Sequence, residues 1–186
     1  MIKIGITGSI SSGKTTTSKI ISKSKGPLFS ADRVVKNLYL KKKFKSKVAK
    51  LLKVRTNTHF KKIIKKKILE NKNNIKVLEK IIHPFVRKEM FSFIKRNRNK
   101  NFLFFEIPLL IESNLSKNFD LIVFVRANKE IRLRRYIKSG GKKKIFEFLD
   151  KLQMKDTLKM RFCDYVIVNN KSINVLKNKI SNIVKL

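Results

Sequence analysis

Eight residues near the amino terminus have the types and spacing of a phosphate-binding loop. Residues 8–15 read GSISSGKT and fit the pattern GxxxxGK[ST]. Glycines let the backbone curl so that successive N–H groups point at phosphate oxygens, and the following helix adds the positive end of its dipole. We expect Lys14 to reach the β- and γ-phosphates and the Thr15 hydroxyl to coordinate Mg²⁺. The pattern predicts a nucleoside-triphosphate site; the alternative is a Gly/Ser-rich turn that binds nothing.

Three parts of the chain are expected to surround the triphosphate. The loop and its next residue contribute Gly8, Ser9, Ile10, Ser11, Ser12, Gly13, Lys14, Thr15 and Thr16. Arg132 and Arg135 lie on a helical stretch before a Gly-Gly hinge, so they can contact phosphates when the hinge closes. A solvated basic face is the alternative for each of them. Asn169 follows the last predicted strand, where a loop can help to form a nucleobase pocket.

Two carboxylates lie at the ends of predicted strands. Asp32 follows the strand 28–30 and is placed to orient an acceptor hydroxyl and accept its proton. It is equally placed to cap the helix 33–40, and its position alone does not decide between the two roles. Glu106 ends the apolar run 102–105, where many phosphate-loop enzymes hold their metal through water.

Short apolar runs alternate with helical patterns along the chain. The predicted strands are 1–7, 28–30, 102–105, 121–125 and 165–168, and the helical stretches between and after them are 16–23, 33–40, 129–138, 145–154 and 173–184. This alternation predicts an α/β protein with the three-layer P-loop NTPase fold and a central parallel sheet. Residues 41–98 have apolar side chains at spacings of three and four, which predicts a Lys-rich helical insertion. Within it, Pro84 suits the first turn of a helix, with His83 near the cap.

The composition bounds the class of protein. The chain has 186 residues, one Cys, no signal-peptide pattern and no apolar stretch near eighteen residues, so we expect one cytoplasmic domain with appendages and no membrane association. Lys and Arg number 47 against 12 Asp and Glu, a formal net charge of +35. Such a charge favours nucleic-acid binding. Because Lys is scattered among Asn and Ile, whose codons are A/T-rich, compositional bias is the competing cause; either cause predicts salt-sensitive, nonspecific binding to nucleic acid.

Several further segments resemble the dephospho-coenzyme A kinase family over nearly the whole chain. Besides the loop 8–15 and Ala31-Asp32, they are LEKIIHPFVR at 78–87, PLLIE at 108–112 and DYVIVN at 164–169, with Gln153 and Lys159 at family positions. The His-Pro and Pro-Leu-Leu segments are far more specific than the loop.

The resemblance implies ATP as phosphoryl donor, Mg²⁺ as cofactor and the ribose 3′-hydroxyl of dephospho-coenzyme A as acceptor. It implies Asp32 and Lys14 as catalytic residues, with Thr15 and Glu106 at the metal. The residues implied for the acceptor are Asp32, His83, Arg87, Pro108 and Leu109. It also implies a nucleotide-binding core of residues 1–40 and 99–186, a substrate domain at 41–98 and a short lid at about 129–150.

The chain departs from the family pattern at a few positions. Glu106 occupies the position of the usual Asp, and Leu149 occupies the position of a usual Arg in a shortened lid. We therefore expect weaker ATP binding than in a typical member. Two other functions stay open at this stage. One is another small P-loop kinase of a nucleoside or nucleotide, and the other is a basic nucleic-acid-binding protein with an idle nucleotide site. A GTP-binding switch would need an [NT]KxD motif, which the chain lacks.

Overall fold

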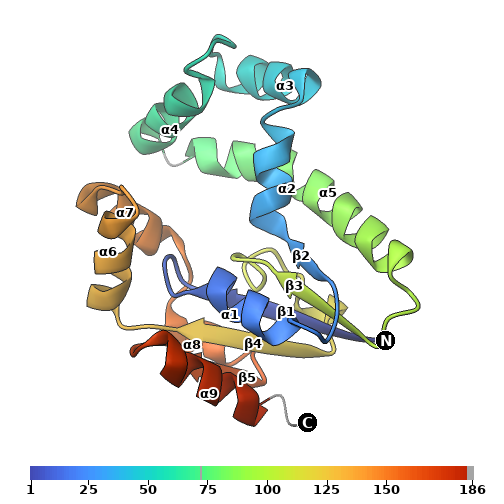
Figure 1. Cartoon of the computed structure of the whole chain (residues 1–186). Helices are drawn as coiled ribbons and strands as arrows, with labels where there is room; N and C mark the ends of the chain where they lie inside the picture. The colour runs from blue at the N-terminus through green and yellow to red at the C-terminus, as the bar shows by residue number, and fades with distance from the viewer. Residues whose placement is uncertain (72, 184–186) are drawn as a thin grey trace. The chain divides into compact units, whose positions relative to one another are not determined.

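Five parallel strands form the centre of the first of two units in the computed structural model, which describes residues 1–71 and 73–183 (Figure 1). The unit comprises Met1–Ser30 and Arg96–Leu186. Its strands are β1 (Ile2–Gly8), β2 (Leu28–Ser30), β3 (Phe102–Glu106), β4 (Leu121–Arg126) and β5 (Tyr165–Val168), in the order β2-β3-β1-β4-β5. The α/β fold with a central parallel sheet is confirmed.

The central strands are buried on both faces, as continuous apolar runs predict. Leu103, Phe104 and Phe105 of β3 are at most 1% exposed. Because all strand pairs are parallel, the carboxyl ends of the strands meet at one edge of the sheet. The register pairs Glu106 with Ile6 of β1 and with Ser30 of β2, so the segments that follow these three strands start close together.

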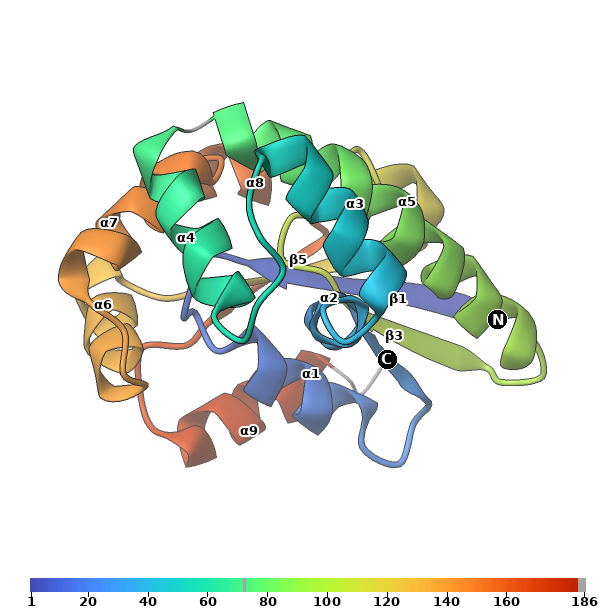
Figure 2. The ribbon, with the colours of Figure 1, turned by 90° about the horizontal axis from the view of Figure 1, so that it is seen from above.

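Helices α1 (Lys14–Ser22) and α9 (Ile173–Ile183) lie side by side on one face of this sheet (Figures 1 and 2). Ile6, Ile21, Ile167, Leu176 and Ile180 belong to the buried cluster that these helices share with the strands. The predicted end of the last helix, Val184, lies outside the described residues. The apolar stripes of both helices thus account for their position.

Helices α6 (Lys129–Lys138) and α7 (Lys143–Leu152) pack against each other, and Figure 1 shows them as a pair at the left. The short helix α8 (Asp156–Met160) and a 3₁₀ turn (Ser116–Asn118) were not expected from the sequence. Both are single turns, too short for a periodic pattern to reveal.

The second unit, Ala31–Lys95, is helical. It holds α2 (Ala31–Leu38), α3 (Lys42–Leu52), α4 (Phe60–Glu70) and nearly all of α5 (Asn73–Arg96). Its buried core consists of Leu38, Phe44, Val48, Leu52, Phe60, Ile64 and Ile81. The unit begins at Ala31 and its core includes Leu38, whereas the predicted insertion begins at residue 41. No described helix is both long and apolar enough to cross a membrane.

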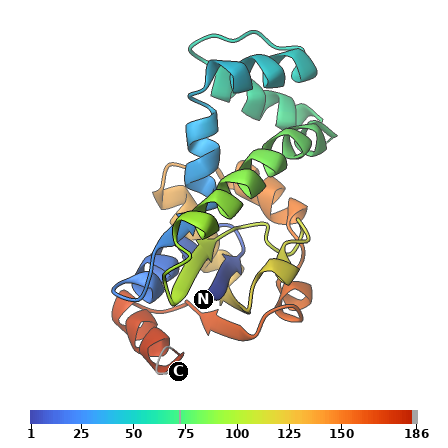
Figure 3. The ribbon, with the colours of Figure 1, turned by 90° about the vertical axis from the view of Figure 1, so that its right-hand side faces the viewer.

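Helix α5 continues through Pro84 without a break in its assignment, and Figure 3 shows it as the long light-green helix. The expectation that Pro84 starts a helix with His83 near its cap is therefore wrong. Proline has no N–H to donate to the carbonyl four residues earlier, a loss that disfavours mid-helix positions. Burial of Ile81, Val86 and Met90 on both sides of it offsets that loss.

Candidate active site

The loop between β1 and α1 has the curled backbone that its glycines predict. Gly8 and Gly13 have φ of 153° and 98°, and Ser11 also has a positive φ of 56°. A Cβ at Gly8 would lie 2.3 Å from the Val125 carbonyl oxygen, and a Cβ at Gly13 would lie 2.2 Å from Asn169 Nδ2. Gly13 is also the N-cap of α1 and brings no capping side chain. The first N–H groups of α1 therefore have no capping side chain and can donate hydrogen bonds to a bound anion.

Lys14 lies folded over this loop. Its side chain is 8% exposed, and Nζ donates a hydrogen bond of 2.8 Å to the Ser9 carbonyl oxygen. The Ser12 N–H donates to the same carbonyl at 3.1 Å. The ammonium group is therefore held inside the turn of the loop, where phosphate oxygens bind in this class of site.

Thr15 and Glu106 form the candidate metal position. The Thr15 hydroxyl donates a short hydrogen bond to Glu106 Oε1, and Glu106 is 2% exposed at the carboxyl end of β3. A hydroxyl and a carboxylate are the hard oxygen ligands that Mg²⁺ takes, usually beside several waters and phosphate oxygens. Among the described residues, no group of three or more His, Cys, Asp or Glu could hold a metal ion. The residues present fit Mg²⁺.

Arg135 of α6 reaches the phosphate loop. Its Nη1 donates to the Ser12 carbonyl oxygen at 3.3 Å, and Asn169 Nδ2 donates to the same oxygen at 2.8 Å. Burial lowers the pKa of the Arg135 guanidinium, and the charge of Arg134 lowers it further. A polyphosphate bound beside Arg135 would relieve both effects, because it supplies the opposite charge.

Arg132 has a different setting on the same helix. Its Nη1 lies 2.5 Å from Asp150 Oδ1, its Nε donates to the Ala127 carbonyl oxygen at 3.1 Å, and its guanidinium lies 5.6 Å from the Phe146 ring centroid. The side chain is almost fully buried, and these contacts join α6 to α7. Arg132 and Arg135 thus have different contacts in the structure, although the sequence pattern does not distinguish them.

Two side chains that contact the loop were missed or left without a role in the sequence analysis. The Ile10 N–H donates to Gln153 Oε1 at 2.8 Å, and the Ser9 hydroxyl donates to Asp156 Oδ1 in a short hydrogen bond. Gln153 follows α7 and Asp156 begins α8. Gln153 carried only a family-position signal, and Asp156 carried none, because nothing local in its sequence indicates a partner near the amino terminus.

The remaining predicted residues belong to two places. In the first unit, Pro108 and Leu109 follow β3, and the Pro108 carbonyl accepts a 3.0 Å hydrogen bond from the Thr7 hydroxyl beside the loop. In the second unit, Asp32 is exposed in the first turn of α2, directly after the chain leaves β2. His83 and Arg87 lie one turn apart on α5, so they share a face of that helix.

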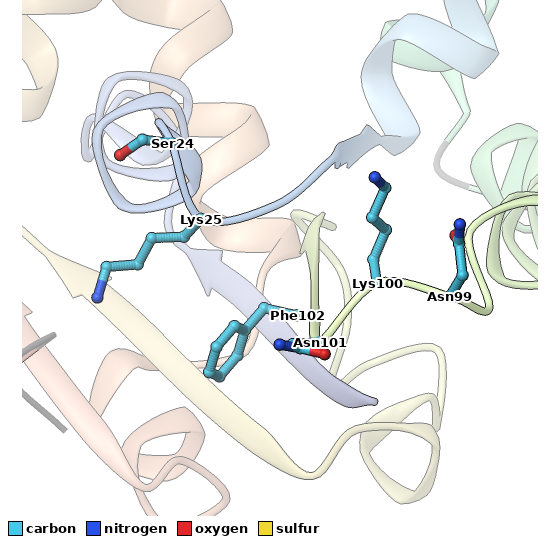
Figure 4. A pocket seen from close by; sticks show the side chains of 6 residues that line it. All are labelled: Ser24, Lys25, Asn99, Lys100, Asn101 and Phe102. Atoms are coloured by element: carbon cyan, nitrogen blue, oxygen red, sulfur yellow. The ribbon is translucent and has the colours of Figure 1, made fainter.

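A separate pocket of about 410 Å³ lies at the other edge of the sheet (Figure 4). Its lining residues are Ser24, Lys25, Asn99, Lys100, Asn101 and Phe102. Phe102 is the first residue of β3, and the Asn101 carbonyl accepts the Ile2 N–H at the start of β1. Ligands of open α/β sheets bind at the carboxyl ends of the strands, so we do not assign the active site to this pocket.

Comparison with known proteins agrees with this geometry. The family model for dephospho-CoA kinase matches residues 2–174. A dephospho-CoA kinase of Rickettsia bellii is 31% identical over 185 residues, covering 99% of this chain and 96% of its own. Two solved structures share the fold at 24% identity. TT1252 from Thermus thermophilus has a TM-score of 0.82 over 99% of this chain and 96% of its own. A dephospho-CoA kinase from Campylobacter jejuni has a TM-score of 0.64, and the match covers 98% of this chain and 95% of that one.

Proposed function

The chain belongs to the dephospho-CoA kinase family, and from this premise we propose that it makes coenzyme A by ATP-dependent phosphorylation of dephospho-coenzyme A. The acceptor is the ribose 3′-hydroxyl, and the reaction is the last step of coenzyme A synthesis. The observation that carries the proposal is the phosphate loop, with Lys14 inside its turn and Thr15 hydrogen-bonded to Glu106. We propose the cytoplasm as its location and ATP and dephospho-coenzyme A as its partners.

The phosphate loop and lid bind the donor in this proposal. The amides of the loop and of the first turn of α1 donate to the β- and γ-phosphates. Lys14 Nζ exchanges the Ser9 carbonyl for phosphate oxygens, a change of side-chain torsions only. Arg135 neutralises charge from the lid side and Asn169 borders the nucleobase. Closure of the lid, residues 129–150, excludes water from the transfer.

Thr15 and Glu106 would hold Mg²⁺, directly or through its water. When bound, the ion would supply positive charge that neutralises the negative charge developing on the phosphates. The chain's own part is to fix the two ligand oxygens, which it does by burying Glu106 at the end of β3. Glu106 carries one methylene more than an Asp would, so its carboxylate reaches further toward the loop.

The second unit contains Asp32, His83 and Arg87, which we propose as contacts of the acceptor substrate. Asp32 accepts the proton of the 3′-hydroxyl as that oxygen attacks the γ-phosphorus, and the bond from phosphorus to the leaving oxygen of ADP breaks. His83, Arg87, Pro108 and Leu109 are the residues that we propose for binding dephospho-coenzyme A. The products are coenzyme A, ADP and the proton held by Asp32.

One assay tests the proposal. Purified protein with Mg-ATP and dephospho-coenzyme A is followed for coenzyme A formation, beside Asp32→Asn and Lys14→Ala. Loss of the base should lower kcat by roughly a hundredfold or more while ATP still binds. Lys14→Ala should lower kcat more than ATP affinity, because the ammonium neutralises charge that grows in the transition state. Equal activity in Asp32→Asn would remove Asp32 from the mechanism. Phosphorylation of nucleosides in place of dephospho-coenzyme A would support the alternative kinase.

A further inference from the structure

An ion pair between a fully buried lysine and a partly exposed glutamate lies behind the phosphate loop and has no part in the mechanism above. Lys159 of α8 is 0% exposed, and its Nζ lies 2.7 Å from Oε1 of Glu112, which follows β3. Among the described residues, Glu112 Oε2 has no hydrogen-bond partner, so the charge-assisted contact at Oε1 holds the pair. Burying the charge of Lys159 is costly, and an apolar pair of the same volume is often as stable. Stability alone therefore does not explain the pair.

The pair is connected to the loop through the segment between α7 and α8. Glu112 Oε1 also accepts the Met154 N–H at 3.2 Å. The neighbouring residue is Gln153, whose Oε1 accepts the Ile10 N–H at 2.8 Å. The hydrogen bond to the Met154 N–H therefore fixes the backbone next to Gln153, and with it the position of the Gln153 Cα.

Lys159, the second member of the ion pair, lies in the same segment. Lys159 lies three residues after Asp156 on α8, so the two share a face of that helix. Asp156 accepts the hydrogen bond from the Ser9 hydroxyl. The segment 153–159 thus holds the first half of the loop by two side chains, and the ion pair holds the segment.

We propose that Glu112 and Lys159 are positioning residues for nucleotide binding, which act through Gln153 on the phosphate loop. They keep the Ile10 amide in place, and with it the curl that presents the other loop amides to phosphate. The inference rests on the proposed function only in that the loop binds a nucleoside triphosphate.

The test measures Mg-ATP binding by calorimetry, without any acceptor. The variants are Gln153→Met, the double variant Glu112→Leu/Lys159→Met, and the triple variant that combines them. The double variant leaves no isolated buried charge. Ile180→Ala is the matched control for loss of stability, because the described members of the buried cluster to which Ile180 belongs lie outside the segment 153–159.

Gln153→Met and the double variant should each raise the Kd for ATP about tenfold, as expected for one lost hydrogen bond that orders a loop. The triple variant should also bind about tenfold more weakly, because both changes remove the same support. Ile180→Ala should lower Tm and leave the Kd unchanged. A double variant that binds ATP like the wild type overturns the proposal, and so does a triple variant whose effect is the product of the two.

Glu112→Asp keeps the test decisive if the double variant does not fold. It retains the charge beside Lys159 but withdraws the carboxylate by one methylene from the Met154 N–H. The Kd for ATP should rise severalfold with Tm close to the wild-type value, and an unchanged Kd overturns the proposal. A wild-type protein that binds ATP but does not phosphorylate dephospho-coenzyme A would refute the proposed function alone.

Discussion

Gly13 has two separate reasons to be glycine. Its φ of 98° is unfavourable for any residue with a Cβ, and that Cβ would meet Asn169 Nδ2 at 2.2 Å. Gly13→Ala should therefore lower the free energy of unfolding by about 1–3 kcal/mol. It should also weaken ATP binding, because Asn169 must leave the Ser12 carbonyl. Urea unfolding and an ATP titration measure the two effects.

Gly140 provides the control for this prediction. Its φ is 85°, but a Cβ there would have nothing within 4 Å. Gly140→Ala should lose stability through backbone strain alone, so the additional loss of unfolding free energy in Gly13→Ala measures the clash with Asn169. If the two variants lose equal unfolding free energy, the approach of Asn169 to Gly13 contributes nothing to stability.

At the scale of elements, α6 carries two arginines with different contacts. Arg135→Met should raise the Kd for ATP roughly tenfold or more, the value of a charge-assisted hydrogen bond. It should cost little stability, since burial and Arg134 already lower the pKa of Arg135 and so disfavour its charged form in the folded protein. Arg132→Met should instead cost about 3 kcal/mol of unfolding free energy, because it leaves Asp150 without its closest cation.

Thermal unfolding and ATP titration of both variants check this division. Lys129 Nζ lies 3.6 Å from Asp150 Oδ2, so the loss in Arg132→Met belongs at the low end of the range for broken buried pairs. A stable Arg132→Met protein with greatly weakened ATP binding would reverse the two assignments. It would place Arg132, as the sequence allows, at the phosphates.

The elements that the sequence predicted well are those with local signals. The strands 28–30 and 165–168 and the helix 129–138 have the same bounds in the structure, because apolar runs and helical periodicity depend on near neighbours. The prediction that Pro84 lies in the first turn of a helix is wrong, because burial in the second unit outweighs a local preference. The contact from Ser9 to Asp156 spans 147 residues, and no local pattern encodes such a pairing. The loop was therefore predictable from sequence, whereas the side chains behind it required the fold.

At the scale of the whole molecule, charge dominates the behaviour in solution. The chain has 47 Lys and Arg against 12 Asp and Glu, so basic side chains exceed acidic ones by 35. Such a field attracts any polyanion, and the attraction to duplex DNA falls steeply with salt because bound counterions are released. If compositional bias is the cause of the charge, this binding has no sequence preference and no relation to the phosphate loop.

The prediction is that duplexes of unrelated sequence bind this protein alike at low salt. Their affinity should fall by roughly a thousandfold or more between about 50 and 200 mM salt, whereas ATP affinity should fall by about tenfold or less, since the loop amides and buried Lys14 are less screened. Lys14→Ala should leave DNA binding as it is. A duplex whose binding survives at the higher salt and depends on its sequence would instead support a nucleic-acid-binding function, since specific contacts to base edges carry an affinity that counterion release does not.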